Sequence, residues 1–323
     1  MMRLSIAGLL LTGVLAASAM CAFADTVYPD RRVLVPYQSV AAAEGLWALR
    51  YNPAALAADE DWQMYLAHTY SDSDLAGNDL IYVGRSGFAF GIEWLGSGGE
   101  ADARHHTLAW GGEIKDRIYL GTSYRWVTSD DALENKAHFW TYSLMVRPGE
   151  HLSLGARLEN ANHMPYVGER TNAVYTYSAA LNLFDERIVL GADFYQVTKQ
   201  RLEDGNYHLT AGWEIVDGLT VFGDYGDKGL PIYGETVQHH KFGLGVQLNL
   251  AEMMLSSYNA FDRDGEFFRG SLAAGSFRER HRTVITPRKE VADFLLGGSP
   301  TERPQPRFFL FPGPGRTMKS SPH

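Results

Sequence analysis

Nine charged residues are the candidates for chemistry in this sequence, because an alternating pattern places them on the polar faces of their segments. Paired carboxylates can transfer protons, whereas carboxylates beside arginines form salt bridges. Nothing in the sequence fixes the separation of carboxylates such as Glu159 and Asp193, so no catalytic pair is predicted. We expect these residues to line a lumen, either as a salt-bridge and water network or as a polar path for solutes: Glu93, Arg125, Arg147, Arg157, Glu159, Asp193, Glu214, Asp224 and Lys241.

Two pairs of adjacent histidines do not predict a metal site. His105-His106 and His239-His240 are adjacent in the sequence, and neighbours on a strand point to opposite faces, so neither pair can chelate one metal ion from strand positions. No zinc-protease, serine-hydrolase or nucleotide-binding motif follows residue 24. We therefore predict no metal, no cofactor and no enzymatic activity.

Composition limits the class of protein further. The 323 residues carry 29 Lys and Arg against 38 Asp and Glu, a net charge of −9. An acidic chain lacks the basic stripe that nucleic-acid binding requires, so no nucleic-acid partner is expected. The hydrophobic content of 45 % is too high for a disordered chain, and 33 glycines with 12 % aromatic residues favour closely spaced β-strands.

The first 24 residues have the pattern of an export signal. A basic start precedes an apolar run, Leu4 to Met20, and an Ala22-Phe23-Ala24 cleavage site. The alternative is a membrane-anchoring helix. Cleavage would start the mature chain near Asp25 and remove Cys21, the only cysteine. The mature chain could then form no disulfide, and no later apolar run is long enough for a spanning helix.

Period-two alternation continues from Trp62 to Phe277. In Lys241–Leu250, for example, apolar residues occupy one face and Lys, Gly, Gln and Asn the other. A soluble β-sandwich with its apolar face inward would give the same pattern, as would a membrane barrel with that face toward lipid. Tyr and Trp near the ends of several segments favour the barrel, because these rings suit a lipid–water boundary.

The lengths of the connections also favour a barrel. Long and short connections alternate, as in an up-and-down membrane barrel with long loops outside the cell and short periplasmic turns. We predict an all-β transmembrane barrel over residues 62–277 with about 14 antiparallel strands: 62–70, 78–86, 88–96, 104–113, 117–127, 137–147, 151–160, 174–184, 187–197, 206–216, 218–225, 240–250, 253–261 and 267–277.

Residues 25–61 differ from the barrel pattern. Between Val40 and Leu56 the chain is Ala-rich, and Ala43, Leu46, Trp47 and Arg50 have helical spacing. An Asn-Pro step at 52–53 then predicts a turn.

The motif after this run carries a family resemblance. Asn52-Pro53-Ala54-Ala55-Leu56, just before the first strand, resembles the corresponding segment of FadL-like and PorV-like outer-membrane proteins of Gram-negative bacteria. The resemblance implies a 14-stranded barrel with residues 25–61 as a plug or hatch in the lumen. It implies a hatch role for Asn52, Pro53, Ala54 and Leu56. Ala55 replaces the usual Gly, and the loops are shorter than in the fatty-acid transporters.

Residues 278–323 form a Pro-rich tail after the alternation ends. Such composition favours an extended periplasmic segment. Val284–Gly298 loosely resembles the opening of the peptidase domain in barrel-fused signal peptide peptidases, but the chain ends before any catalytic residue of that domain.

Three functions follow from this organisation. The first is an outer-membrane channel for hydrophobic small molecules, opened by movement of the hatch. The second is a non-transporting platform in the lipid bilayer of the outer membrane, docking a periplasmic protein through residues 283–323. The third is a soluble periplasmic β-protein.

Overall fold

The computed structural model describes residues 33–58, 61–70, 78–96, 103–115, 117–132, 134–166, 169–170, 172–184, 186–199, 201–226, 231–232, 235–236, 241–250, 253–262 and 264–276. These residues all belong to the first of two compact units, Met1–Ile285, and the second unit, Thr286–His323, lies outside them. The expected signal peptide (1–24), residues 25–32 and the expected tail (278–323) also lie outside the described residues.

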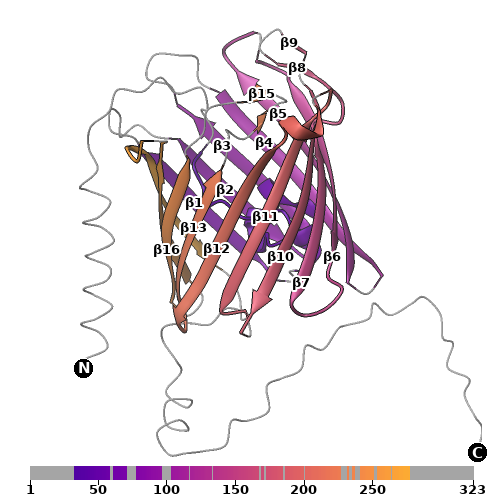
Figure 1. Ribbon diagram of the computed structural model, residues 1–323. Helices are drawn as coiled ribbons and strands as arrows, with labels where there is room; N and C mark the ends of the chain where they lie inside the picture. Colours follow the sequence, from indigo (N-terminus) through magenta and orange to yellow (C-terminus); the bar gives the residue numbers. More distant parts are fainter. Residues whose placement is uncertain are drawn as a thin grey trace, which may run out of the picture. The chain divides into compact units, whose positions relative to one another are not determined.

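Fourteen strands form one closed barrel, in which every strand is antiparallel to both neighbours (Figure 1). Consecutive barrel strands pair in chain order, and the last strand closes the barrel against the first, with Met64 opposite Ser276. The strands are β1 (Gln63–Tyr70), β2 (Asp79–Arg85), β3 (Phe88–Leu95), β4 (Ala103–Lys115), β5 (Ile118–Ser129), β6 (His138–Val146), β7 (Leu152–Glu159), β10 (Val174–Leu183), β11 (Ile188–Val197), β12 (Asn206–Val216), β13 (Leu219–Gly226), β16 (Phe242–Leu250), β17 (Met253–Phe261) and β18 (Phe267–Ser276).

The predicted barrel is confirmed, and no described strand boundary differs from its prediction by more than two residues. Two small hairpins in the long connections were not predicted: β8 (Pro165–Tyr166) with β9 (Glu169–Arg170), and β14 (Pro231–Ile232) with β15 (Glu235–Thr236). A short 3₁₀ turn, η3 (Leu202–Asp204), precedes β12. We call the end with these hairpins the long-connection end; it lies at the top of Figure 1. The opposite end is the short-turn end.

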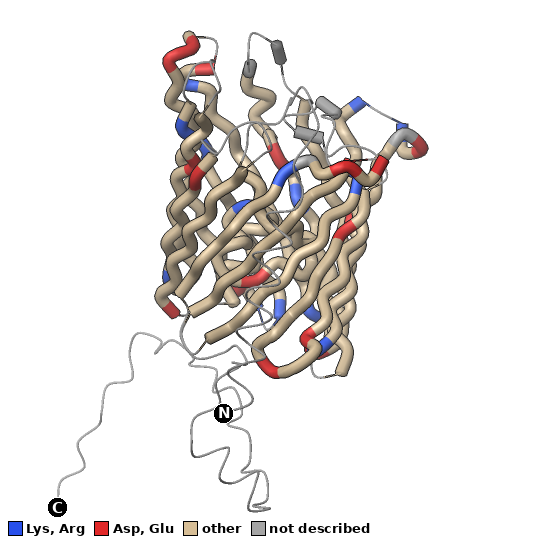
Figure 2. The backbone as a smooth tube through the Cα atoms, turned by 90° about the vertical axis from the view of Figure 1, so that its left-hand side faces the viewer, with Lys and Arg blue, Asp and Glu red and all other residues tan. Residues whose placement is uncertain are grey.

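The apolar face of each strand points outward. In β16, for example, Leu244 is 54 % exposed whereas Gly243 and Gly245, its neighbours in sequence, are buried. Trp213 and Leu108 are exposed in the same way on β12 and β4. Figure 2 shows most Lys, Arg, Asp and Glu toward the two ends of the barrel, with long uncharged stretches of strand between them. This orientation is opposite to that of a sandwich, in which the apolar faces meet in a core.

Residues 33–58, which we call the luminal segment, contain three short helical elements. These are η1 (Gly45–Trp47), α2 (Ala48–Tyr51) and η2 (Pro53–Ala58). The helical spacing predicted between Val40 and Leu56 corresponds to short elements instead of one continuous helix, for two physical reasons. Gly45 has φ +57, outside the helical region, and Asn52 is extended, φ −156 and ψ 91, because it precedes Pro53.

The luminal segment lies inside the barrel and forms its core. Trp47, Leu49 and Leu56 are buried against inward-facing wall residues such as Tyr82. The segment begins at the long-connection end, where the Leu34 amide donates to Thr69 Oγ1 near the end of β1 (2.8 Å). It ends at the short-turn end, where Ala57 approaches Gly87 in the turn between β2 and β3. No helix in the described ranges is long and apolar enough to cross a membrane.

Candidate functional site

The candidate site is the interface between the luminal segment and the inner wall of the barrel. It contains the four residues of the predicted hatch motif. Asn52, Ala54 and Leu56 are buried, and Pro53 is buried with them. The side-chain amide of Asn52 donates to the Val40 carbonyl (2.6 Å), and its oxygen accepts the Ala54 amide (3.1 Å). Asn52 therefore joins two stretches of the luminal segment across the turn that Pro53 enforces.

The turn at Pro53 packs closely against small residues of the barrel wall. The Ala54 amide also donates to Ser143 Oγ on β6 (2.9 Å). A Cβ atom on Gly121 would lie 2.1 Å from the Ala54 nitrogen, and one on Gly111 would lie 2.4 Å from the Pro53 oxygen. Side chains at these two wall positions would collide with the backbone, so glycine permits the close approach.

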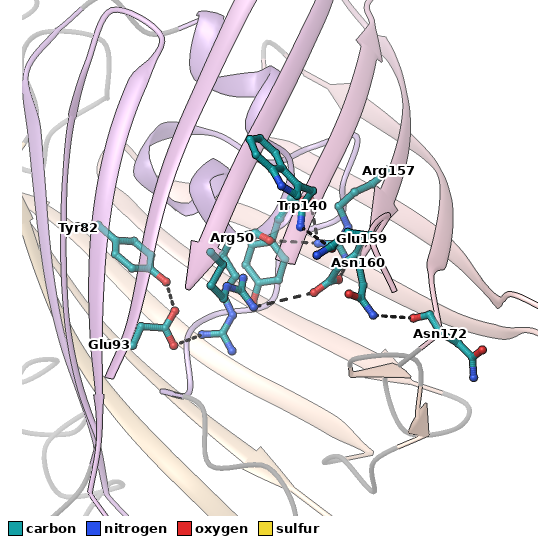
Figure 3. A network of polar contacts seen from close by, with 11 residues as sticks. Arg50, Tyr82, Glu93, Trp140, Arg157, Glu159, Asn160 and Asn172 are labelled. Carbon is teal, nitrogen blue, oxygen red and sulfur yellow. Dashed lines mark hydrogen bonds and ion pairs between the residues drawn. The ribbon is translucent and has the colours of Figure 1, made fainter. Parts of the chain in front are cut away.

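An ionic cluster fixes the luminal segment to the wall at Arg50 (Figure 3). It combines one residue of the luminal segment, Arg50, with four charged wall residues: Glu93, Arg125, Arg157 and Glu159. Arg50 lies 3.9 Å from Glu93, Arg125 lies 4.0 Å from Glu159, and Arg157 lies 3.0 Å from Glu159. The side chains are only 5 to 12 % exposed. Charges so removed from water must be paired, and each carboxylate of the cluster lies within 4.0 Å of an arginine.

Two members of this cluster make further hydrogen bonds. Tyr82 donates its hydroxyl to Glu93 (2.5 Å). Arg157 donates from Nη1 to the carbonyls of Arg50 and Tyr51, both at 3.1 Å. These carbonyls belong to the last turn of α2, where helix geometry leaves them without intrahelical partners.

Asp193 anchors the beginning of the luminal segment. It accepts hydrogen bonds from the Tyr37 hydroxyl (2.6 Å), Ser39 Oγ (2.8 Å) and the Val40 amide (3.2 Å). Ser178 on β10 also donates to Asp193. A buried carboxylate is costly unless several donors satisfy it, so Asp193 specifies where residues 37–40 lie.

A second hydrogen-bonded cluster, formed by His208, Asp224 and Tyr258, lies beside Tyr37. His208 Nε2 is 2.8 Å from Asp224 Oδ2, and Tyr258 donates its hydroxyl to Asp224 Oδ1 (2.5 Å). The Tyr37 ring stacks on His208 with centroids 3.8 Å apart. Sequence reasoning placed Asp224 in the lumen but missed His208 and Tyr258. Their positions on the inward faces of β12 and β17 could have indicated them.

The remaining predicted lumen residues lie elsewhere. Glu214 faces a cavity at the short-turn end and accepts the Gly218 amide (2.9 Å). Arg147 faces the same cavity and lies 3.7 Å from Glu44. Lys241 places its ammonium 4.9 Å from the Tyr225 ring centroid. That ring is exposed on the outer side of the wall, so Lys241 points away from the lumen, contrary to the prediction. Attraction to the electron-rich ring accounts for the difference.

The cavity has a volume of about 280 Å³ and lies between residues 36–47 of the luminal segment and the wall. Within the ranges that the structure describes, no three His, Cys, Asp or Glu side chains are grouped so that they could hold a metal ion. The arrangement can thus close a barrel and hold a small polar molecule.

Comparison with known proteins gives fold similarity alone. No protein-family model matches the sequence, and no curated protein matches it. The Acinetobacter baumannii outer membrane protein Omp33 is similar in structure, with a TM-score of 0.47, 8 % identity, and coverage of 69 % of this chain and 100 % of that chain. KdgM porin has a TM-score of 0.38, 8 % identity and coverage of 67 % and 99 %. A triple mutant of Rhodopseudomonas blastica porin has a TM-score of 0.39, 11 % identity and coverage of 67 % and 98 %.

Proposed function

We propose that this protein is an outer-membrane β-barrel channel whose lumen is closed by the luminal segment. The observation that carries the proposal is a closed 14-stranded barrel with an apolar outer face and a buried segment through its interior. A closed barrel has no free strand edge, so it can lie in lipid without unpaired backbone groups.

The aromatic residues of the outer face support a membrane position. Rings from four adjacent strands contact one another at the long-connection end: Phe242 and Phe261 (4.9 Å), Phe261 and Phe267 (6.3 Å), and Phe267 and Tyr70 (6.2 Å). Around the barrel, Trp126 stacks on His106 (5.0 Å). At the short-turn end, Phe88 and Trp110 are exposed on neighbouring strands. Aromatic girdles of this kind flank the apolar band of membrane barrels.

Two observations bear on the class of solute that the channel would carry. The resemblance to FadL-like proteins favours a hydrophobic small molecule released when the turn at Asn52 and Pro53 moves. The cavity favours a polar solute, because amide, hydroxyl and charged side chains make up much of its lining. We give the cavity more weight, since hydrophobic ligands require predominantly apolar pockets.

A non-transporting platform of the PorV type is the second candidate. It is favoured by the contacts that hold the luminal segment along its whole length, from Leu34 to Ala57. In that case residues 283–323 would dock a periplasmic protein, and the barrel would serve as a membrane anchor.

Conductance across a planar lipid bilayer tests whether the luminal segment closes an otherwise open barrel. The full chain is compared with a variant lacking residues 33–58, in potassium chloride, after heat-modifiable gel migration has shown that both are folded. We expect the full chain to stay mostly closed and the deletion variant to conduct at least about ten-fold more, because a water-filled barrel of this class conducts ions. A folded deletion variant that does not conduct would contradict the channel and favour the platform.

A further inference from the structure

The cavity at the short-turn end has walls of two kinds. One side is the luminal segment, with Gln38 and Glu44, and the other is the inward face of the barrel, with Asn182, Thr210 and Gln247. At about 280 Å³, it is close to the lower end of the volumes of small-molecule sites, which begin at roughly 300 Å³. Its size therefore suits a small ligand.

Both arginines of the lining lie beside carboxylates of the protein. Arg147 lies 3.7 Å from Glu44, and Arg187 lies 2.6 Å from Asp217. Glu214 accepts the Gly218 amide. A strongly charged ligand would have to break these contacts, whereas a neutral ligand would leave them in place.

Unsatisfied polar atoms in the lining point to a hydrogen-bonding ligand. Ser153 Oγ and Arg147 Nε are buried and, among the described residues, have no hydrogen-bond partner. Arg147 directly follows β6 and Ser153 lies opposite it on β7, since Val146 pairs with Leu154. Across the cavity, the Gln247 side chain donates to that of Asn249 (3.0 Å), and two amide groups retain further donors and acceptors. Buried polar groups left unpaired are costly, so a ligand that pairs with them gains affinity.

We propose that this cavity is a binding site for a neutral, hydroxyl-rich molecule of sugar size. Hydroxyl groups both donate and accept, which matches a lining of amides, hydroxyls and compensated charges. The inference rests on the proposed channel, because it names the class of solute held between the luminal segment and the wall. Binding is measured on the closed protein, so the site can fail without contradicting the channel.

Gly212 allows the cavity to be filled selectively. It lines the cavity, and a Cβ atom at this position meets nothing within 4 Å. The first atom of a side chain at this position thus meets open space, and Gly212→Leu places an apolar side chain in the lining of the cavity. Gly149 is the matched control, because a Cβ atom there also meets nothing within 4 Å and the residue lies in the turn between β6 and β7, outside the lining.

Saturation-transfer NMR tests the proposal on the full-length protein, in a detergent without a sugar head group. The probes are sucrose, glutamate, lysine and octanoate. We expect binding of sucrose alone, retained in Gly149→Leu and reduced at least ten-fold in Gly212→Leu. Ser153→Ala should weaken sucrose binding about five-fold, the effect of one lost hydrogen bond. Preference for octanoate or a charged probe, equal sucrose binding by Gly212→Leu, or no sucrose binding by the unaltered protein would overturn the proposal.

Discussion

Arg157 illustrates how a single wall residue can position the luminal segment. Its guanidinium lies beside Glu159 and donates to the last carbonyls of α2. The two hydrogen bonds join the wall directly to the backbone at the end of α2. Arg157 therefore contacts both the ionic cluster of the wall and the end of α2, and so fixes where α2 lies.

We predict that Arg157→Gln loosens the luminal segment. The substitution leaves Glu159 without its nearest cation, and loss of one partner of a buried ion pair costs about 3 kcal/mol. Urea unfolding in vesicles should show this loss, and bilayer recordings should show more frequent opening. Arg187→Gln is the control, because its ion pair with Asp217 is exposed and contributes at most about 1 kcal/mol. Equal stability of the two variants would contradict this role.

Alternation in the sequence was sufficient to place Glu93, Arg125, Arg157 and Glu159 on inward faces, where the structure has them. It could not predict which charges meet. Arg50 reaches Glu93 from a segment 43 positions earlier, and such contacts depend on strand register and on the path of the luminal segment. The His208–Asp224–Tyr258 group was missed for the same reason, because its members come from three strands.

At the scale of elements, η2 lies against β4 and β5 where both strands carry glycine. The prediction from the sequence treated Gly111 and Gly121 simply as residues suited to strands. Their function becomes visible only when the backbone of residues 53 and 54 lies against them.

We predict that Gly121→Ala displaces η2 or destabilises the barrel. The added methyl group would lie 2.1 Å from the Ala54 nitrogen, and overpacking of this kind costs about 1–3 kcal/mol. The change is measurable as a lower urea midpoint or as increased conductance. Gly212→Ala is the matched control, since its methyl group meets nothing within 4 Å. A Gly121→Ala variant that behaves like Gly212→Ala would show that the close approach does not matter.

Elements with local signals were predicted well, and elements that depend on distant contacts were not. The barrel strands carry period-two alternation and turn residues, so their bounds were close to those observed. In the luminal segment, local patterns predicted helical spacing and the turn at Pro53, but the path of its short helices depends on the surrounding wall. The hairpins β8–β9 and β14–β15 each pair only two residues per strand, too few for alternation to be recognised.

For the whole molecule, the outward apolar face determines the environment that the barrel requires. We predict that Leu108→Arg, in the middle of β4, destabilises the barrel in lipid by about 2–4 kcal/mol, the cost of a cation at the membrane midplane. Ile114→Arg, near the end of the same strand, should cost at most about 1 kcal/mol. Both residues are exposed, at 52 % and 63 %, so equal effects in vesicle unfolding would contradict a membrane position.

Closure of the lumen by the luminal segment can be tested by tying the segment to the wall. Ser39 Oγ and Ser178 Oγ are 2.7 Å apart, one on the luminal segment and one on β10. Paired cysteines at these positions can therefore form a disulfide without large movement. The variant for the test carries Ser39→Cys and Ser178→Cys in the Arg157→Gln background, with Cys21→Ser, and each single cysteine variant serves as a control.

The decisive measurement is the conductance of this variant in a planar bilayer before and after a reductant is added. We predict a closed barrel when the disulfide is formed and a conducting barrel when it is reduced, with no redox effect in either control. A barrel that conducts while the disulfide is formed, as verified by mass spectrometry, would contradict closure of the lumen by residues 33–58.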